Sequence, residues 1–127
     1  MAETHLHTLP KSERLCSQKV LQRLFSGEHR SISVFPIRAV FMESEEPGVR
    51  IMVSVSKRHF KRAVKRNRVK RQLREAYRLN KQILQNLNTG LNIAFLWNLA
   101  DILPTHAVIQ KMQHLLNRIH ESITQAK

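Results

Sequence analysis

The sequence has few of the residues that mark several large classes of protein. Its single cysteine cannot form an internal disulfide, which fits a reducing compartment such as the cytoplasm. Only three glycines and four prolines occur in 127 residues, so nothing indicates a fibrous or low-complexity chain. No apolar run approaches the roughly 20 residues of a membrane-spanning helix, and the N-terminus lacks the pattern of a signal peptide. We therefore expect a cytoplasmic protein without a membrane partner.

Acidic residues are also scarce. Nine Asp and Glu stand against 22 Lys and Arg, which gives a net charge of +13. Net charge says little about a fold but much about partners. With the membrane disfavoured, the expected partner of this chain is a nucleic acid.

Hydrophobic residues make up 42% of the chain, enough for the core of one domain. We expect a loose polar arm over residues 1–11 and a single domain over residues 12–127. Periodicity and turn residues predict its elements. The expected helices and strands are a helix over Ser12–Phe25, strands over Ile32–Met42, Val49–Ser56 and Leu91–Asn98, a basic helix over Lys61–Arg78, and a last helix from Thr105.

This order, α-β-β-α-β-α, predicts an α+β fold in which helices cover a small sheet. The polar segment Glu43–Gly48 separates the first two strands, which we expect to pair as an antiparallel hairpin. Pro36 cannot donate to a ladder of backbone hydrogen bonds, so we expect an edge or a bulge at that position. The apolar stripe of the last helix and Trp97 are expected to belong to the core.

Positive charge is concentrated between Lys57 and Arg78, where eleven basic residues accompany one acid, Glu75. This segment contributes +10, and the rest of the chain contributes only +3 of the total. Like charges on neighbouring helix positions destabilise one another by a few tenths of a kcal/mol each. A polyanion would turn that repulsion into attraction.

A helical projection divides the basic segment into two faces. Val69, Leu73 and Ala76 fall on one side, with Tyr77 at its edge. The opposite side carries a polar stripe at spacing i, i+4, i+7, i+11, flanked by Arg68 and Lys70. The members of this stripe are Asn67, Arg71, Arg74 and Arg78.

The alternative to a nucleic-acid surface is an ordinary solvated helix face. Three features weigh against it. Acids that would form i, i+4 pairs are nearly absent, and Arg outnumbers Lys seven to four between Lys57 and Arg78. In addition, Asn67 occupies a position of the stripe where an ordinary solvated helix would carry a stronger helix former. Arginine offers the planar fork that suits phosphates and bases. The flanking elements are expected to be strands rather than the helices of a helix-turn-helix unit, which favours RNA over DNA.

The segment "SVSKRHFKRAVKRNRVKRQLREAYR", from Ser54 to Arg78, resembles the signature of the bacterial ribonuclease P protein component. The core of the match is "RNRVKRQLRE". The resemblance implies a ribosomal-protein-like fold with a left-handed βαβ crossover. It also implies the protein subunit of a ribonucleoprotein that removes the 5′ leader of precursor tRNA in a Mg²⁺-dependent endonucleolytic cleavage, leaving the mature 5′ end. In that family a large RNA carries the active site and its Mg²⁺ ions.

The resemblance also implies two RNA-facing surfaces. The expected partners are the catalytic RNA and the precursor tRNA, with no DNA and no obligate protein partner. The residues implied to face the catalytic RNA are Lys57, Arg66, Asn67, Arg68, Lys70, Arg71 and Arg74. A second surface, between the first helix and the sheet, is implied to hold the leader. Phe25 matches an aromatic residue there, whereas Leu21 and Arg38 stand where many members have an aromatic; Arg38 offers a cation–π or phosphate contact instead.

No Ser-His-Asp set, nucleotide-binding loop or carboxylate pair is found in the sequence. We therefore expect no catalytic residue and no metal site in the protein itself. Two other functions fit the composition: a ribosomal or RNA-chaperone-type binding module without a role in cleavage, and a free-standing protein nuclease. The "RNRVKR" core weighs against the first, and the missing acid–base set weighs against the second.

Overall fold

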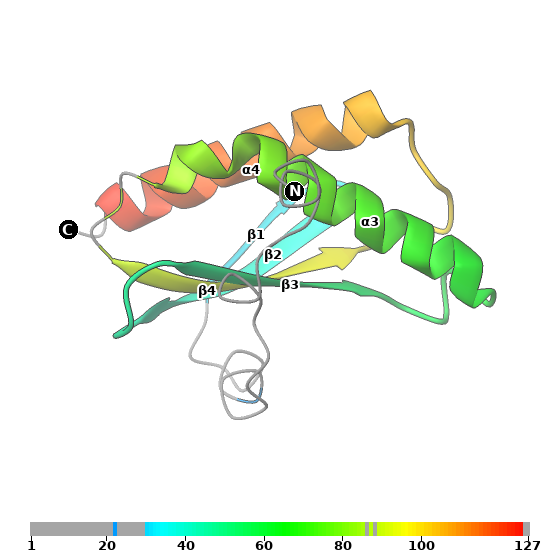
Figure 1. The fold of residues 1–127 in the computed structure, drawn as a ribbon, viewed down its shortest axis with the longest axis horizontal. Coiled ribbons are helices and arrows are strands. Elements are labelled where there is room, and N and C mark those ends of the chain that lie inside the picture. The colour runs from blue at the N-terminus through cyan, green and yellow to red at the C-terminus, as the bar shows by residue number, and fades with distance from the viewer. Residues whose placement is uncertain (1–21, 23–29, 86, 88, 126–127) are drawn as a thin grey trace, which may run out of the picture.

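The structure is a computed structural model, and it describes residues 22, 30–85, 87 and 89–125. Apart from Gln22, the predicted first helix and the predicted arm lie outside the described residues. Figure 1 shows two helices lying over one face of a sheet. The described elements are β1 (Arg30–Val34), β2 (Ile37–Ser44), β3 (Val49–Val55), α3 (Ala63–Asn80), the short 3₁₀ helix η2 (Lys81–Leu84), β4 (Gly90–Trp97) and α4 (Thr105–Gln125).

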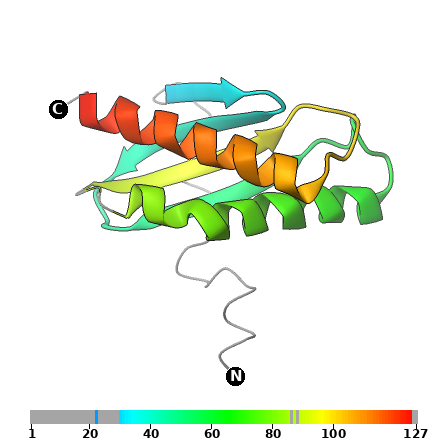
Figure 2. The same cartoon turned by 90° about the horizontal axis from the view of Figure 1, so that it is seen from above.

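The four strands form one sheet in the order β1-β2-β4-β3. β4 pairs antiparallel with β2 and parallel with β3, so Leu91 lies between Glu43 and Val49. The chain leaves β3, runs through α3 and returns as the adjacent parallel strand β4. Figures 1 and 2 show this crossover in the left-handed sense, against the usual right-handed preference. The predicted α+β fold, with helices covering a small sheet, is confirmed.

The predicted antiparallel hairpin between the second and third described strands is wrong, because β4 lies between β2 and β3. The reason is burial on both faces. Nearly every residue of β4 is buried, including Ala94 and Asn92 on the face away from the helices. A strand that is buried on both sides stabilises the sheet most in the centre. β3, which carries Arg50 and Ser54, takes the edge.

The predicted strand over Ile32–Met42 is in fact two strands. Phe35 and Pro36 form a tight turn, and β1 folds back antiparallel on β2 with Val34 opposite Ile37. Pro36 has no N–H to donate to a ladder, so a turn suits it better than the edge or bulge that the sequence predicted. The backbone N–H of Asn98 donates to the Pro36 carbonyl at 2.8 Å, which ties the turn to the end of β4.

The core lies between the helices and the sheet. The predicted stripe of α4 is confirmed, since all six of its residues are fully buried: Val108, Met112, Leu115, Leu116, Ile119 and Ile123. Trp97 is also a core residue, as predicted. Two buried amides join the helix layer. Gln72 Nε2 donates to the Leu103 carbonyl at 3.0 Å, and Asn80 Nδ2 donates to the Ile109 carbonyl at 3.2 Å. These bonds fix the position of α3 relative to α4.

The helices of the described residues are too short or too polar to span a membrane. Figure 2 shows α3 and α4 side by side over the sheet. Each helix buries one face and exposes the other. The exposed face of α3 is therefore presented on a rigid support.

The connection between β2 and β3 crosses over the first residue of β4. A Cβ placed on Gly90 would lie 1.8 Å from the carbonyl oxygen of Glu46, and the Leu91 N–H donates to the Gly48 carbonyl at 3.0 Å. A side chain at residue 90 is therefore incompatible with this crossing. Gly48, by contrast, has φ 96°, and a methyl group placed there would meet nothing within 4 Å.

We predict that Gly90→Ala destabilises the fold by about 3 kcal/mol or more, because the methyl group would collide with backbone. Gly48→Ala should cost only about 1–2 kcal/mol, the penalty of a left-handed conformation. Urea denaturation of both variants at one fixed sulfate concentration measures the difference. Equal, small losses in the two variants would contradict the crossing of the connection over β4.

Candidate nucleic-acid interface

The predicted apolar side of α3 is confirmed. Val69, Leu73 and Ala76 are fully buried, and Tyr77 is buried with them. The ring of Tyr77 lies 6.0 Å from that of Phe95 on β4, centroid to centroid, in a tilted arrangement. This contact surface fixes the rotation of α3 about its axis, so it also decides which residues face outward.

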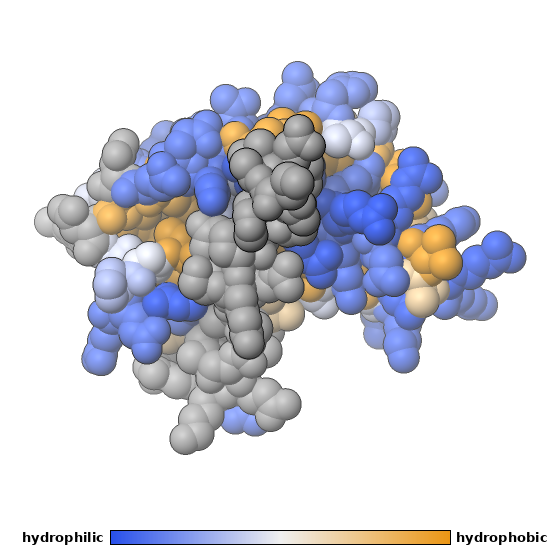
Figure 3. Space-filling model, viewed as in Figure 1, coloured by the Kyte–Doolittle hydropathy of each residue, from blue (hydrophilic) through white to orange (hydrophobic). Residues whose placement is uncertain are grey.

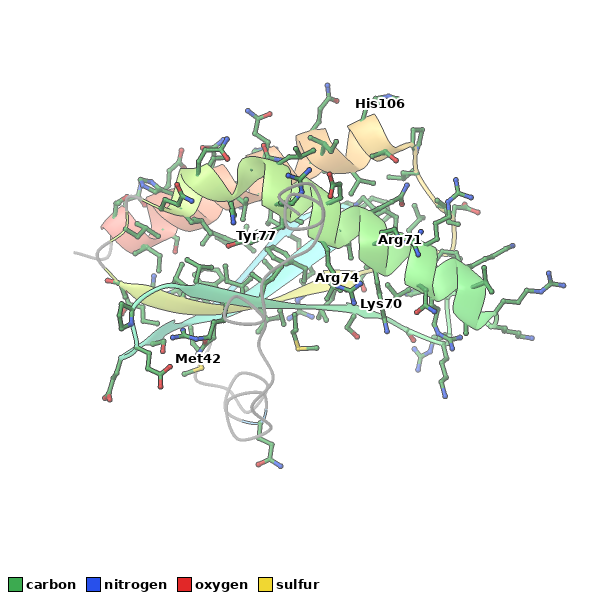
Figure 4. All side chains as sticks on the ribbon, in the orientation of Figure 1. Met42, Lys70, Arg71, Arg74, Tyr77 and His106 are labelled. Atoms are coloured by element: carbon green, nitrogen blue, oxygen red, sulfur yellow. The ribbon has the colours of Figure 1, made fainter. Side chains whose placement is uncertain are left out.

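The outward face of α3 carries most of the predicted polar stripe. Asn67, Arg68, Arg71 and Arg74 are exposed, and Lys70 is half-buried beside them. Figure 4 shows Lys70 and Arg74 extending from α3 on the side of β3, with Arg71 one turn along the helix from Arg74. Figure 3 shows a hydrophilic surface over this part of the helix. Five of the seven predicted RNA-facing residues therefore share one surface, which we call the α3 surface.

Arg78 is the one member of the predicted stripe that departs from it. Its guanidinium pairs with the carboxylate of Glu75, with Nε donating at 3.0 Å to Oε2, and both side chains are half-buried. The hydrogen bond from Arg78 to Glu75 raises the pKa of Arg78 further above its usual range. The only acid of the basic segment is therefore paired with its last arginine. Among the described residues, Arg68 and Arg71 have no acidic partner.

Arg66 has a structural role that the sequence did not reveal. Its Nη1 donates to the carbonyl of Phe60 at 2.8 Å and to that of Lys61 at 3.0 Å. Phe60 is itself buried in the core, and its N–H donates to the Ser56 carbonyl at 3.3 Å. Arg66 thus holds the turn that enters α3, and its half-buried side chain is only partly available to a ligand. Hydrogen bonds to backbone six residues away leave no periodic signal in a sequence.

The N-terminus of α3 is electrostatically unfavourable in the free protein. Arg62 occupies the N-cap position without a side-chain hydrogen bond, and the first turn holds no acid. The helix dipole places a partial positive charge at that end, where cations are repelled and anions are stabilised. The predicted site residue Lys57 and its neighbour Arg58 are exposed just before this helix. Phosphates bound here would satisfy free N–H groups and neutralise the cations together.

Arg58 and Arg62 were counted in the charge of the segment but not among the predicted site residues. The structure places both on the exposed approach to α3. Position immediately before a basic helix is the signal that would have identified them, because helix N-termini favour anions.

The residues predicted for the second surface are only partly described. Leu21 and Phe25 lie outside the described residues. Arg38 lies on β2 and is exposed, with its Nε donating at 2.9 Å to Oγ of Ser31 on β1. It belongs to the sheet face away from α3 and α4, where a small apolar cluster surrounds Val40 and Ala94. Arg38 and the α3 surface are therefore on different sides of the sheet.

The described chain offers no metal centre. Among residues 22, 30–85, 87 and 89–125, no three His, Cys, Asp or Glu side chains come together. Cations dominate the α3 surface, and they repel a divalent metal. The arrangement can bind and orient an anion, but its own groups do not form an acid–base pair.

Comparison with known proteins identifies the family. The family model described as Ribonuclease P matches residues 9–120. The ribonuclease P protein component of Porphyromonas gingivalis is 43% identical over 119 residues, covering 87% of this chain and 85% of that protein. The corresponding protein of Chlorobium phaeobacteroides is 36% identical over 94 residues, covering 68% of this chain and 63% of that protein.

Solved structures show the same fold. The RNase P protein of Thermotoga maritima superposes with a TM-score of 0.70 at 24% identity, covering 84% of this chain and 96% of that one. The RNase P protein of Staphylococcus aureus gives a TM-score of 0.68 at 23% identity, covering 86% and 96%.

The geometry predicts that Arg66 and Arg71 differ in their effect on stability. Arg66→Ala removes two hydrogen bonds to the turn before α3 and should lower the free energy of unfolding by about 1–2 kcal/mol. Arg71→Ala removes an exposed side chain and should change it by less than about 0.5 kcal/mol. Thermal or urea unfolding followed by circular dichroism at fixed sulfate tests this. An Arg66→Ala variant as stable as Arg71→Ala would mean that Arg66 does not hold the turn.

Proposed function

The chain belongs to the ribonuclease P protein family, so it is a protein component of that enzyme complex, and we propose that it binds the catalytic RNA of the complex through the α3 surface. The observation that carries this proposal is the exposure of Asn67, Arg68, Arg71 and Arg74 on one side of a helix whose other side is fixed to the sheet. Membership of the family gives RNase P RNA as the partner.

The α3 surface suits a folded RNA for physical reasons. Guanidinium groups bind phosphate oxygens through two parallel N–H donors and keep their charge at any working pH. Consecutive turns of α3 present them in a row, and the uncapped N-terminus adds backbone donors at one end. Asn67 adds an amide that both donates and accepts hydrogen bonds. A phosphate backbone lying along α3 would replace the repulsion among these cations with attraction.

A second contact is proposed for the substrate. Arg38 lies on the other side of the sheet, so it can meet a different RNA segment from the one held by α3. We propose that this segment is the 5′ leader of precursor tRNA, and that Arg38, Leu21 and Phe25 contact it. One small protein would then hold the catalytic RNA and the substrate in a fixed relative position, which lowers the entropic cost of bringing the scissile phosphate to the active site.

The chemistry itself is proposed to reside in the RNA. The described side chains include no cluster that would hold Mg²⁺, so we propose that the RNA binds the ions which activate water for hydrolysis. The protein residues bind phosphates, orient the leader and reduce the repulsion between two RNAs. The product is a tRNA with a mature 5′ end, and the reaction is expected in the cytoplasm.

We predict a steep salt dependence for binding to the catalytic RNA. If about six phosphates are contacted, log affinity should fall with log salt at a slope of roughly −4 to −5. Arg71→Gln should weaken binding and make the slope shallower by about 0.7–0.9, because one phosphate contact is lost. Filter binding or fluorescence anisotropy over a range of KCl concentrations measures both quantities.

The matched control is Lys111→Gln, which removes one charge from α4, outside the α3 surface. It should leave the slope unchanged. We also expect the wild-type protein to stimulate precursor cleavage by the catalytic RNA at low Mg²⁺, and the double variant Arg68→Gln/Arg71→Gln to lose this stimulation. If Arg71→Gln and Lys111→Gln had equal effects, the loss of affinity would follow from net charge, and the proposed role of the α3 surface would be contradicted. Full cleavage by the double variant, or co-purification with ribosomal subunits instead of the processing RNA, would refute it.

A further inference from the structure

One aromatic side chain lies on the surface, against the pattern of all the others that the structure describes. Phe35, in the turn between β1 and β2, is 65% exposed. The five other described aromatic residues are each at most 5% exposed: Phe41, Phe60, Tyr77, Phe95 and Trp97. A single exposed apolar residue is ordinary in itself, so its meaning depends on how Phe35 is held and on what surrounds it.

The turn that carries Phe35 is firmly held. Val34 and Ile37 pair on either side of it, Pro36 is buried, and the Asn98 N–H donates to the Pro36 carbonyl at 2.8 Å. The side chain is therefore presented to solvent by a rigid hairpin. A rigid aromatic ring loses little conformational entropy when it stacks on a flat partner.

The strand register places Phe35 at the basic end of the sheet. Ile37, just after the turn, lies opposite Trp97, and Trp97 lies opposite Val55. Val55 is followed by Lys57 and Arg58, and then by the N-terminus of α3. The β1–β2 turn, the end of β4 and the start of the basic segment therefore share one end of the molecule, as Figure 2 shows.

Charge at this end favours an anionic ligand. Among the described residues, the strand ends and turns here carry five cations and one acid, Asp101. Arg38, three residues after Phe35, is exposed and fixed by its bond to Ser31 Oγ at 2.9 Å. The cations are Arg38, Lys57, Arg58, Lys61 and Arg62.

We propose that Phe35 is a stacking platform for one unpaired nucleobase of the bound RNA, with cations of the same end holding the adjoining phosphates. Aromatic rings bind bases in this way in proteins that recognise single-stranded RNA. The inference rests on the proposed function and extends it to a residue that the family signature does not contain. It also supplies an aromatic contact in a chain whose leader surface has Leu21 and Arg38 where many relatives have aromatic residues. The base comes either from the leader or from a single-stranded segment of the catalytic RNA.

The test compares Phe35→Leu, which keeps an apolar side chain, with Phe35→Tyr, which keeps an aromatic ring. Stacking of one base is worth about 1–3 kcal/mol, so Phe35→Leu should weaken RNA binding by about 5-fold or more, whereas Phe35→Tyr should bind within about 2-fold of wild type. Because no charge is removed, the salt slope should stay unchanged in both. The control is Leu79→Ala, which changes an exposed apolar residue on α3 instead of the β1–β2 turn and should bind RNA as tightly as wild type.

Two arms identify the source of the base. In one, the complete complex binds precursor tRNA with a full leader or with a leader cut to one nucleotide; in the other, the protein binds the catalytic RNA alone. A loss that disappears with the short leader assigns the base to the leader, and a loss in the second arm assigns it to the catalytic RNA. Phe35→Trp adds a direct readout, because its fluorescence should be quenched by the RNA that stacks on it while buried Trp97 is unaffected.

Phe35→Leu binding as tightly as wild type in both arms, with no quenching of Phe35→Trp, would overturn the stacking site. That result would leave the proposed function standing, because wild-type protein would still bind the catalytic RNA and assist cleavage. Failure of the proposed function itself is different, because wild-type protein would then neither bind the catalytic RNA nor assist cleavage.

Discussion

The structure depends on a balance between an apolar contact and the repulsion of the cations that it holds in place. Val69, Leu73 and Ala76 fix α3 to the sheet, while eleven basic residues and one acid occupy Lys57–Arg78. Glu75 is paired with Arg78, so it relieves charge at the end of the row. The uncapped N-terminus adds the dipole of the helix to the same excess. Such a helix is stable because its buried side is apolar, and its exposed side gains most from a polyanion.

The position of β4 decides how the two proposed RNA contacts are arranged. Because β4 is buried on both faces, it takes the centre of the sheet, and β3 moves to the edge beneath α3. The connection from β2 to β3 must then cross over β4, which is possible because residue 90 is glycine. The same topology brings the β1–β2 turn and the start of α3 to one end of the sheet. A central apolar strand thus places the exposed ring of Phe35 at the end where α3 begins.

Local patterns predicted more of this molecule than long-range ones. The apolar side of α3, the buried stripe of α4 and the position of the last strand follow from periodicities within one element, and all are confirmed, the strand with bounds one residue earlier than predicted. Strand pairing was predicted wrongly, because an alternating pattern identifies a strand without naming its neighbour. The exposure of Arg71 was predictable from helical spacing, whereas the bonds from Arg66 to Phe60 and Lys61 depend on a turn of irregular shape. Similarly, the reversal of the chain at Pro36 was not predicted, so β1 and β2 were predicted as a single strand.

Salt acts on this protein in two opposed ways. Added ions screen the repulsion among the exposed cations of α3, whose spacing along the helix is within a Debye length of about 8–10 Å at 0.1–0.15 M. Screening therefore stabilises the free protein. The same ions should weaken the proposed binding to RNA, because the release of counterions on forming a complex is less favourable at higher salt. Multivalent anions are expected to stabilise the fold more than their ionic strength alone would, since the uncapped start of α3 offers them backbone N–H groups. If the α3 surface binds RNA as proposed, folding and RNA binding are linked through one surface, and a loss of affinity at high salt is expected to come from broken phosphate contacts rather than from an unfolded protein.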